Sequence, residues 1–134
     1  MTLRIAALAS GTGSNVIAIL DAIEKGGLDA RLELVLSNKT DAPVLEKART
    51  RCVPFWARNH KDFASREAFD QAMLEEIARA SADTIVLAGY MRMLSPAFIQ
   101  AFAGHILNIH PSILPNFAGA HGGQDALDYG VRFT

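Results

Sequence analysis

Short apolar runs recur along the chain and alternate with segments in which apolar residues return every three or four positions. The runs predict strands at residues 3–9, 31–37, 52–57, 83–89 and 105–111. The periodic segments predict helices from about Ser14 to Gly26, and at residues 40–51, 65–81 and 95–103. A short helix or turn is expected at 122–130, and a strand begins at 131–134. This alternation predicts an α/β fold, with a mostly parallel sheet and helices on both faces.

The helix ends carry recognisable signals. The expected N-caps are Ser65, Ser95 and, for the helix at 40–51, either Thr40 or Asp41. Pro43 and Pro96 suit the first turns of their helices, where a missing N–H costs nothing. Phe69, Met73 and Ile77 lie four residues apart and are therefore expected on one buried face.

Length and composition fit one domain over residues 1–134 of an ordinary globular protein. The net charge of −1 and the pI of about 6.4 do not favour a nucleic-acid partner. No apolar run approaches the ~20 residues of a membrane span. The single cysteine, Cys52, is expected to be a buried, inert thiol, and its lack of a disulfide partner within the chain favours the reducing cytoplasm.

Three polar segments follow predicted strands at the edge where parallel sheets bind ligands. They are "SGTGSN" after the first strand, "GYMRMLSP" after the fourth and "NIHPSILP" after the fifth. Their convergence predicts a site at the carboxyl ends of the strands.

The first of these segments is rich in glycine but is not a dinucleotide fingerprint. Gly11 and Gly13 have the G-x-G spacing, yet the third glycine is absent and no acid follows the second strand. Free N–H groups at the start of the helix, with Ser14 and Asn15, favour an anion such as a phosphate monoester. The alternative is a tight turn capped by Ser14.

Asn108 and His110 lie two apart on the fifth strand and should point the same way, while Ile109 points to the opposite layer. An amide can donate to a developing oxyanion, and an imidazole can exchange a proton beside it. The pair suits attack on a carbonyl group. The alternative is a satisfied polar pair at the end of a strand.

No other residue plainly supplies a nucleophile or a metal site. Ser112 lacks a G-x-S-x-G elbow. His60, His105 and His121 do not have metal-ligand spacing with acids or cysteines, so no metal is expected. His121 alone could line the same cleft as His110.

The segments "LASGTGSN", "LSNKTDAPVLEKA", "VLAGYMRMLSP" and "NIHPSILP" together resemble the folate-dependent formyltransferases, in the family's order and along essentially the whole chain. The Gly-Ser-Asn loop is similar to that of the members acting on glycinamide ribonucleotide. The resemblance implies a Rossmann-like formyltransferase fold and transfer of a formyl group from 10-formyltetrahydrofolate to the amine of glycinamide ribonucleotide, in de novo purine biosynthesis. It further implies that no metal is used. The protein is expected to act in the cytoplasm as a monomer or homodimer.

The resemblance also implies roles for particular residues. The substrate phosphate would lie on Gly13, Ser14 and Asn15. Asn108 would stabilise the oxyanion, and His110 would shuttle a proton or assist as a cation. The folate would contact Arg66, Met91, Arg92, Met93, Leu94 and Asn108.

The family's catalytic aspartate lies in a segment downstream of Thr134, and neither Asp125 nor Asp128 is a credible substitute. We therefore expect a domain truncated at its C-terminus and poorly active alone. Two alternatives stay open. One is hydrolysis of formyltetrahydrofolate, although such relatives usually carry a histidine where Pro111 stands and a further N-terminal domain. The other is a non-catalytic module that binds a phosphate or nucleotide.

Overall fold

The computed structural model describes residues 2–109 of the chain. Its strands are β1 (Leu3–Leu8), β2 (Ala30–Ser37), β3 (Phe55–Ala57), β4 (Thr84–Ala88) and β5 (Ile106–Ile109). Its helices are α1 (Ser14–Glu24), α2 (Pro43–Thr50), the 3₁₀ helix η1 (His60–Asp62), α3 (Arg66–Ala80) and α4 (Pro96–Ala101). Each predicted strand and helix within residues 2–109 is therefore confirmed. The elements expected at 122–130 and 131–134 lie outside the described residues.

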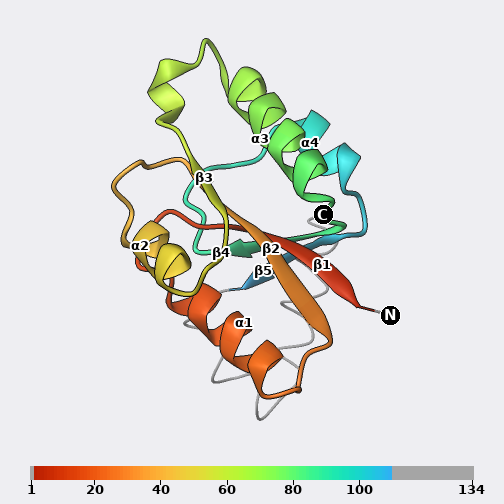
Figure 1. Ribbon diagram of the computed structural model, residues 1–134. Helices are drawn as coiled ribbons and strands as arrows, with labels where there is room; N and C mark the ends of the chain where they lie inside the picture. Colours follow the sequence, from red (N-terminus) through yellow and green to blue (C-terminus); the bar gives the residue numbers. More distant parts are fainter. Residues whose placement is uncertain (1, 110–134) are drawn as a thin grey trace.

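The five strands form one sheet in the order β3-β2-β1-β4-β5, and every pairing between them is parallel. The chain builds outward from β1 to β3, then crosses to the other side of β1 to form β4 and β5 (Figure 1). The strand order thus reverses between β1 and β4. Such a switch point is where open α/β sheets bind ligands, beyond the carboxyl ends of the strands.

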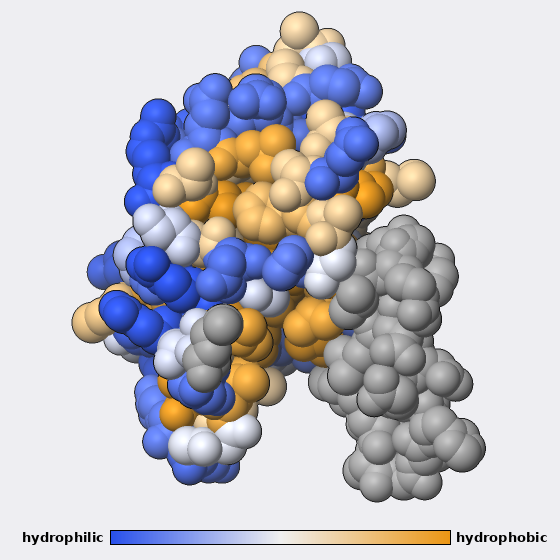
Figure 2. All heavy atoms as spheres, turned by 90° about the vertical axis from the view of Figure 1, so that its right-hand side faces the viewer, coloured by the Kyte–Doolittle hydropathy of each residue, from blue (hydrophilic) through white to orange (hydrophobic). Residues whose placement is uncertain are grey.

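Helices cover both faces of the sheet, as the apolar strands predict. α1 and α2 pack on one face and α3 and α4 on the other (Figure 1). Within β1, Ile5 and Ala7 join the first layer while Ala6 and Leu8 join the second, because successive side chains on a strand point to opposite faces. Figure 2 shows the molecule from the side where the strands begin, with apolar side chains visible between more polar regions.

Two of the predicted caps and one buried helix face are confirmed. The Oγ atoms of Ser65 and Ser95 accept hydrogen bonds from the N–H groups of the third residues that follow, in α3 and α4. The predicted face of α3 is fully buried in the second layer, through Phe69, Met73 and Ile77. Nearby residues in the sequence therefore determine where α3 and α4 begin and which face of α3 is buried.

Two local predictions were wrong. The N-cap of α2 is Ala42, not Thr40 or Asp41. Pro43 occupies the first helical position, and a residue before proline is pushed into extended conformation, so the helix can begin only after Ala42. Cys52 is exposed, not buried. Its φ of 61° places it in the left-handed region just past the end of α2, where the chain turns.

None of the helices within residues 2–109 combines the length and apolar character that a membrane span requires.

Candidate functional site

The loops after β1 and β4 meet at the switch point of the sheet. The backbone N–H of Ser10 donates to the carbonyl of Gly89 over 3.2 Å, which ties the two loops together. A pocket of about 200 Å³ opens between them. Its lining consists of the glycine-rich loop, the start of α1 and the end of β4, through Gly11, Thr12, Gly13, Ser14, Asn15, Ala88 and Gly89. The three residues predicted to hold a phosphate therefore share one pocket.

Gly13 gives this pocket its shape. Its φ of +83° lies in the left-handed region, and a Cβ placed there would clash with Cγ2 of Val44. The N–H of Val44 in turn donates to the carbonyl of Gly11 over 3.0 Å, so α2 packs directly against the loop. A side chain at position 13 would meet both backbone strain and a clash.

The start of α1 is open to an anion. Its N-cap is Gly13, so the alternative in which Ser14 caps the turn is wrong. Ser14 is exposed at the first helical position, Asn15 is buried, and the first turn of α1 carries no acid and no side-chain cap among the described residues. The N–H groups and the positive end of the helix dipole therefore favour a ligand carrying negative charge.

A buried hydrogen-bond chain links three strand ends and was not predicted from the sequence. The hydroxyl of Ser10, after β1, donates to Oδ1 of Asn38, after β2, over 2.6 Å. The same hydroxyl accepts from the N–H of Met91, after β4, over 2.9 Å. Ser10 and Asn38 are 4% and 2% exposed. The sequence did contain a usable indication of this chain, because a serine and an asparagine each directly follow a predicted buried strand.

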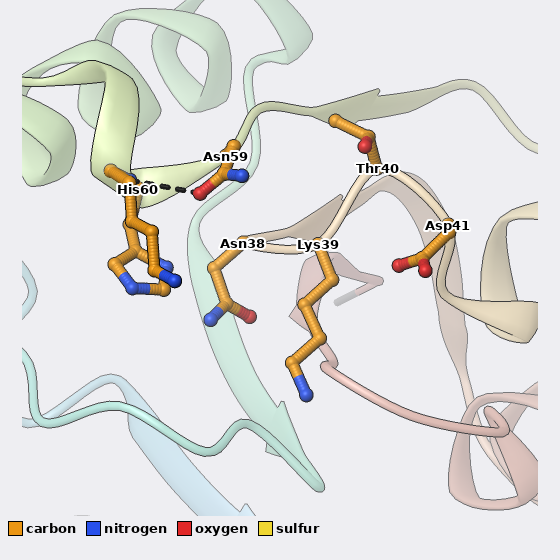
Figure 3. Close-up of a pocket in the computed structure, with 7 residues that line it drawn as sticks. Asn38, Lys39, Thr40, Asp41, Asn59 and His60 are labelled. Carbon is orange, nitrogen blue, oxygen red and sulfur yellow. Dashed lines mark hydrogen bonds between the residues drawn. The ribbon is translucent and has the colours of Figure 1, made fainter.

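Asn38 also borders a second, more polar pocket of about 310 Å³. Figure 3 shows Asn38 and Lys39, after β2, across from Asn59 and His60, after β3. Thr40, Asp41 and Lys61 complete the lining. Nδ1 of His60 is buried and has no hydrogen-bond partner within the described residues. This pocket adds polar residues that follow β2 and β3 to those found at the carboxyl ends of β1 and β4.

Asn108 lies on β5, directly across from Leu87 of β4. Ile106, two residues earlier, packs in the α3/α4 layer together with Leu87, whereas Ile109 packs in the α1/α2 layer. The alternation along β5 therefore places Asn108 on the α3/α4 side of the sheet, and the predicted opposite orientation of Ile109 is confirmed. His110 lies outside the described residues.

The predicted folate residues other than Asn108 lie at the start of α3 and in the segment after β4, and they differ in exposure. Met91 and Met93 are 77% and 74% exposed, whereas Leu94 is buried in the α3/α4 layer. Large apolar side chains left this exposed are available to an apolar ligand. Arg66 is exposed at the first position of α3. Arg92 is half-buried, with its guanidinium carbon 5.7 Å from the ring centroid of Phe69.

A buried carboxylate, that of Asp70, follows Phe69 on α3. Asp70 is 1% exposed, and its Oδ2 accepts from the N–H of Ser95 over 2.6 Å. Burial raises the pKa of Asp70, against the opposing effects of the Ser95 hydrogen bond and of the charges of Arg92 and Arg66. Burial likewise raises the pKa of Tyr90, and the charge of Asp70 adds to that rise. Asp70 was not predicted from the sequence, although an acid on the apolar face of a predicted helix was a usable signal.

The described residues contain no cluster of three histidine, cysteine or acidic side chains that could hold a metal ion. Ser112, His121, Asp125 and Asp128 lie outside them.

Comparison with known proteins identifies relatives of this chain. A family model described as "Formyl transferase" matches residues 3–134. Phosphoribosylglycinamide formyltransferase of Escherichia coli (strain K12) is 44% identical over 128 residues, which cover 96% of this chain and 60% of that protein. The trifunctional purine biosynthetic protein adenosine-3 of Bos taurus is 42% identical over 131 residues, which cover 98% of this chain and 13% of that protein.

Solved structures agree with these matches. The crystal structure of glycinamide ribonucleotide transformylase 1 from Symbiobacterium toebii superposes with a TM-score of 0.79 at 41% identity, covering 97% of this chain and 61% of that one. The chain thus spans about 60% of the length of the bacterial relatives it matches.

Proposed function

Since this chain belongs to the formyl transferase family, as the resemblance of its motifs indicated, we propose that the protein transfers a formyl group from 10-formyltetrahydrofolate to glycinamide ribonucleotide. The amine nitrogen of the ribonucleotide attacks the formyl carbon. The bond from that carbon to N10 of the folate then breaks, the amine loses a proton and N10 gains one. The products are the formylated ribonucleotide and tetrahydrofolate, as in de novo purine biosynthesis.

The observation that carries this proposal is the pocket at the switch point. It joins a glycine-rich loop to the uncapped start of α1, next to the end of β4. Backbone N–H groups at a helix start bind a phosphate without needing a cationic side chain. Gly13, Ser14 and Asn15 are accordingly proposed to hold the phosphate of the ribonucleotide.

The chemistry is assigned to the end of β5. In the proposal, the amide of Asn108 donates to the oxyanion that develops on the formyl oxygen, the kind of interaction that stabilises a tetrahedral intermediate. His110, two residues further on, exchanges a proton at the reacting nitrogen or assists as a cation. The placement of Asn108 on the α3/α4 side supports this role, because Leu94 packs in the same layer and Arg92 lies over Phe69 of that layer.

The folate side is proposed to consist of Arg66, Met91, Arg92, Met93 and Leu94. The exposed thioethers of Met91 and Met93 suit the flat apolar face of a pterin. The two arginines suit the anionic and carbonyl groups of the folate. No residue of this set calls for a metal, and the folate acts as a co-substrate.

The activity test measures tetrahydrofolate released from 10-formyltetrahydrofolate with and without glycinamide ribonucleotide. The proposal predicts release that depends on the ribonucleotide and matches the formylated product in amount. Release without the ribonucleotide would instead identify a hydrolase. Binding of the ribonucleotide with no release would identify a non-catalytic phosphate-binding module.

We also infer a single domain over residues 1–134, located in the cytoplasm, that acts as a monomer or homodimer on small molecules and not on nucleic acid. Sedimentation of the purified protein at several concentrations measures the oligomeric state.

A further inference from the structure

The segment between β4 and α4 carries most of the proposed folate residues but has little structure of its own. Residues 89–95 form neither a helix nor a strand. Met91 and Met93 are 77% and 74% exposed, so packing does not fix their side chains. Between Tyr90 and Leu94, the N–H of Met91 is the one backbone group that makes a hydrogen bond within the described residues. The position of the two thioethers therefore depends on very few contacts.

Ser10 supplies that hydrogen bond. Its hydroxyl oxygen accepts from the N–H of Met91 over 2.9 Å, although the two residues lie 81 positions apart in the chain. The N–H of Ser10 also donates to the carbonyl of Gly89 over 3.2 Å. A single residue directly after β1 thus holds the first part of the segment at two points.

Asn38 orients the hydroxyl of Ser10. A serine hydroxyl has one hydrogen to donate and lone pairs with which to accept. Oδ1 of Asn38 takes the hydrogen over 2.6 Å, which leaves the lone pairs of Ser10 for the N–H of Met91. Ser10 and Asn38 are 4% and 2% exposed, so water has little access to compete for the hydroxyl. The arrangement fixes both the place and the direction of the acceptor.

A second buried serine shows that such a bond need not reach a site. Ser37, fully buried at the end of β2, accepts from the N–H of Lys39 over 3.1 Å. That bond closes a turn within two residues of the serine itself. The hydroxyl of Ser10 instead crosses to a segment that has no other backbone hydrogen bond of its own among residues 2–109 beyond Gly89. Local turn geometry therefore does not explain Ser10.

We propose that Ser10 is a positioning residue of the folate side: its hydroxyl, oriented by Asn38, holds the backbone at Met91 and thereby sets where Met91 and Met93 lie beside the phosphate pocket. This inference rests on the proposed function, in which the two methionines contact the folate. Ser10 acts through the backbone of Met91 and not on a reacting atom.

Hydrogen exchange followed by NMR tests the contact in the unaltered protein. The amide of Met91 should exchange at least about tenfold more slowly than the amides of Arg92 and Met93, which make no hydrogen bond within the described residues. Equal exchange at the three amides would mean that Ser10 does not hold the segment, and the inference would be overturned.

Ser10→Ala should affect the two substrates unequally. The variant loses the hydroxyl but keeps the backbone hydrogen bond to Gly89, and the lining of the phosphate pocket is unchanged. The KM for 10-formyltetrahydrofolate should rise about threefold to tenfold, as expected for the loss of one buried hydrogen bond. The kcat and the KM for glycinamide ribonucleotide should stay within about twofold of wild type. The slow exchange of the Met91 amide should disappear.

Asn38→Ala tests the orienting role. The oxygen of Ser10 remains in this variant, so the KM for 10-formyltetrahydrofolate should rise less than in Ser10→Ala. A larger rise than in Ser10→Ala would show that Asn38, and not Ser10, holds the segment.

Ser37→Ala is the matched control, because it also removes the hydroxyl of a fully buried serine near the end of a strand. It should lower the Tm, as Ser10→Ala does, but leave both KM values within about twofold of wild type. If Ser37→Ala raised the KM for the folate as much as Ser10→Ala, or if Ser10→Ala raised both KM values equally, the effect would be a general loosening of the site and the proposal would be overturned.

The two proposals fail in different ways. If the Met91 amide is protected but the protein releases no tetrahydrofolate, the proposed function fails and the folate role of Ser10 fails with it, while the hydrogen bond to Met91 stands. If release depends on the ribonucleotide but Ser10→Ala keeps the wild-type KM for the folate, the proposed function stands and the inference about Ser10 is wrong.

Discussion

The loop after β1 and the loop after β4 end side by side, yet they are held by different kinds of contact. The first consists of glycine backbone and a helix start, packed against Val44, with no acid in the first turn of α1. The second depends on side chains far apart in sequence: Asp70 accepts from the N–H of Ser95, and Arg92 lies over the ring of Phe69. Met91 and Met93 in this loop are exposed.

This difference shows how each loop can recognise a ligand. We call the loop after β1 the backbone side and the loop after β4 the side-chain side. Backbone N–H groups have fixed positions and bind the same compact anion whatever the neighbouring side chains. A pocket edge of arginine and methionine adapts to a larger, partly apolar molecule but needs buried groups to keep it in place. The two sides should therefore fail in different ways when they are mutated.

The largest effect is expected at the junction of the two sides. Asn108→Ala should lower kcat about 10²–10³-fold, because an oxyanion donor acts mainly in the transition state. The affinity for glycinamide ribonucleotide, measured by calorimetry, should stay near that of wild type. His110→Ala should behave similarly. Loss of ribonucleotide binding in either variant would mean that the pair holds substrate instead.

The backbone side should be broken by a single methyl group. Gly13→Ala is expected to reduce the free energy of unfolding by about 2–4 kcal/mol in urea titrations, from strain at positive φ and the clash with Val44. Gly26→Ala is the matched control, since Gly26 has a φ of +79° but open space around its Cβ position. It should cost only about 1 kcal/mol. Equal losses in both variants would show that the contact with Val44 is unimportant.

The link between the two sides should be weaker. Ser10→Ala removes the hydroxyl that joins Asn38 to Met91 and should cost about 1–3 kcal/mol of stability, because the buried Oδ1 of Asn38 and the part-buried N–H of Met91 lose their partner. A double-mutant cycle with Asn38→Ala isolates the shared bond. Strictly additive losses would contradict a direct link.

The smallest effect concerns pH. The raised pKa of Asp70 means that its contribution to stability is fully present below its ordinary value of 3.8 and is lost as pH rises through the folded-state pKa. The hydrogen bonds from Ser95 and the charges of Arg92 and Arg66 oppose this rise of the Asp70 pKa but do not cancel it. The stability of Asp70→Asn relative to wild type should therefore increase from pH 4 towards neutrality. A difference that stays constant with pH would show that Asp70 does not titrate.

The two loops also differ in how far the sequence could predict them. The glycine loop, the capping serines and the apolar strands are local signals, and each was found where expected. Ala42 as an N-cap was predictable too, because Pro43 forces the residue before it out of the helix. The exposure of Cys52 could not be predicted. The residue that turns the chain in the left-handed region after a helix is usually glycine, and here it is cysteine.

The buried polar contacts of Ser10, Asn38 and Asp70 are of another kind. Ser10, Asn38 and Asp70 meet partners between 25 and 81 residues away in the chain. Periodicity places each of them on a strand end or a helix face but does not say which group it will meet. Their pairing emerges only when the sheet is assembled.

The central claim, that the start of α1 holds the phosphate, is tested most directly by Ser14→Asp. An acid at the first helical position stabilises a helix, so any loss of binding cannot come from unfolding. Calorimetric titration should show that glycinamide ribonucleotide binds at least about tenfold more weakly to Ser14→Asp, through repulsion of like charges. The control Ala18→Asp, exposed on the next turn of α1, should bind normally. Wild-type affinity in Ser14→Asp would contradict the assignment of the phosphate to this pocket.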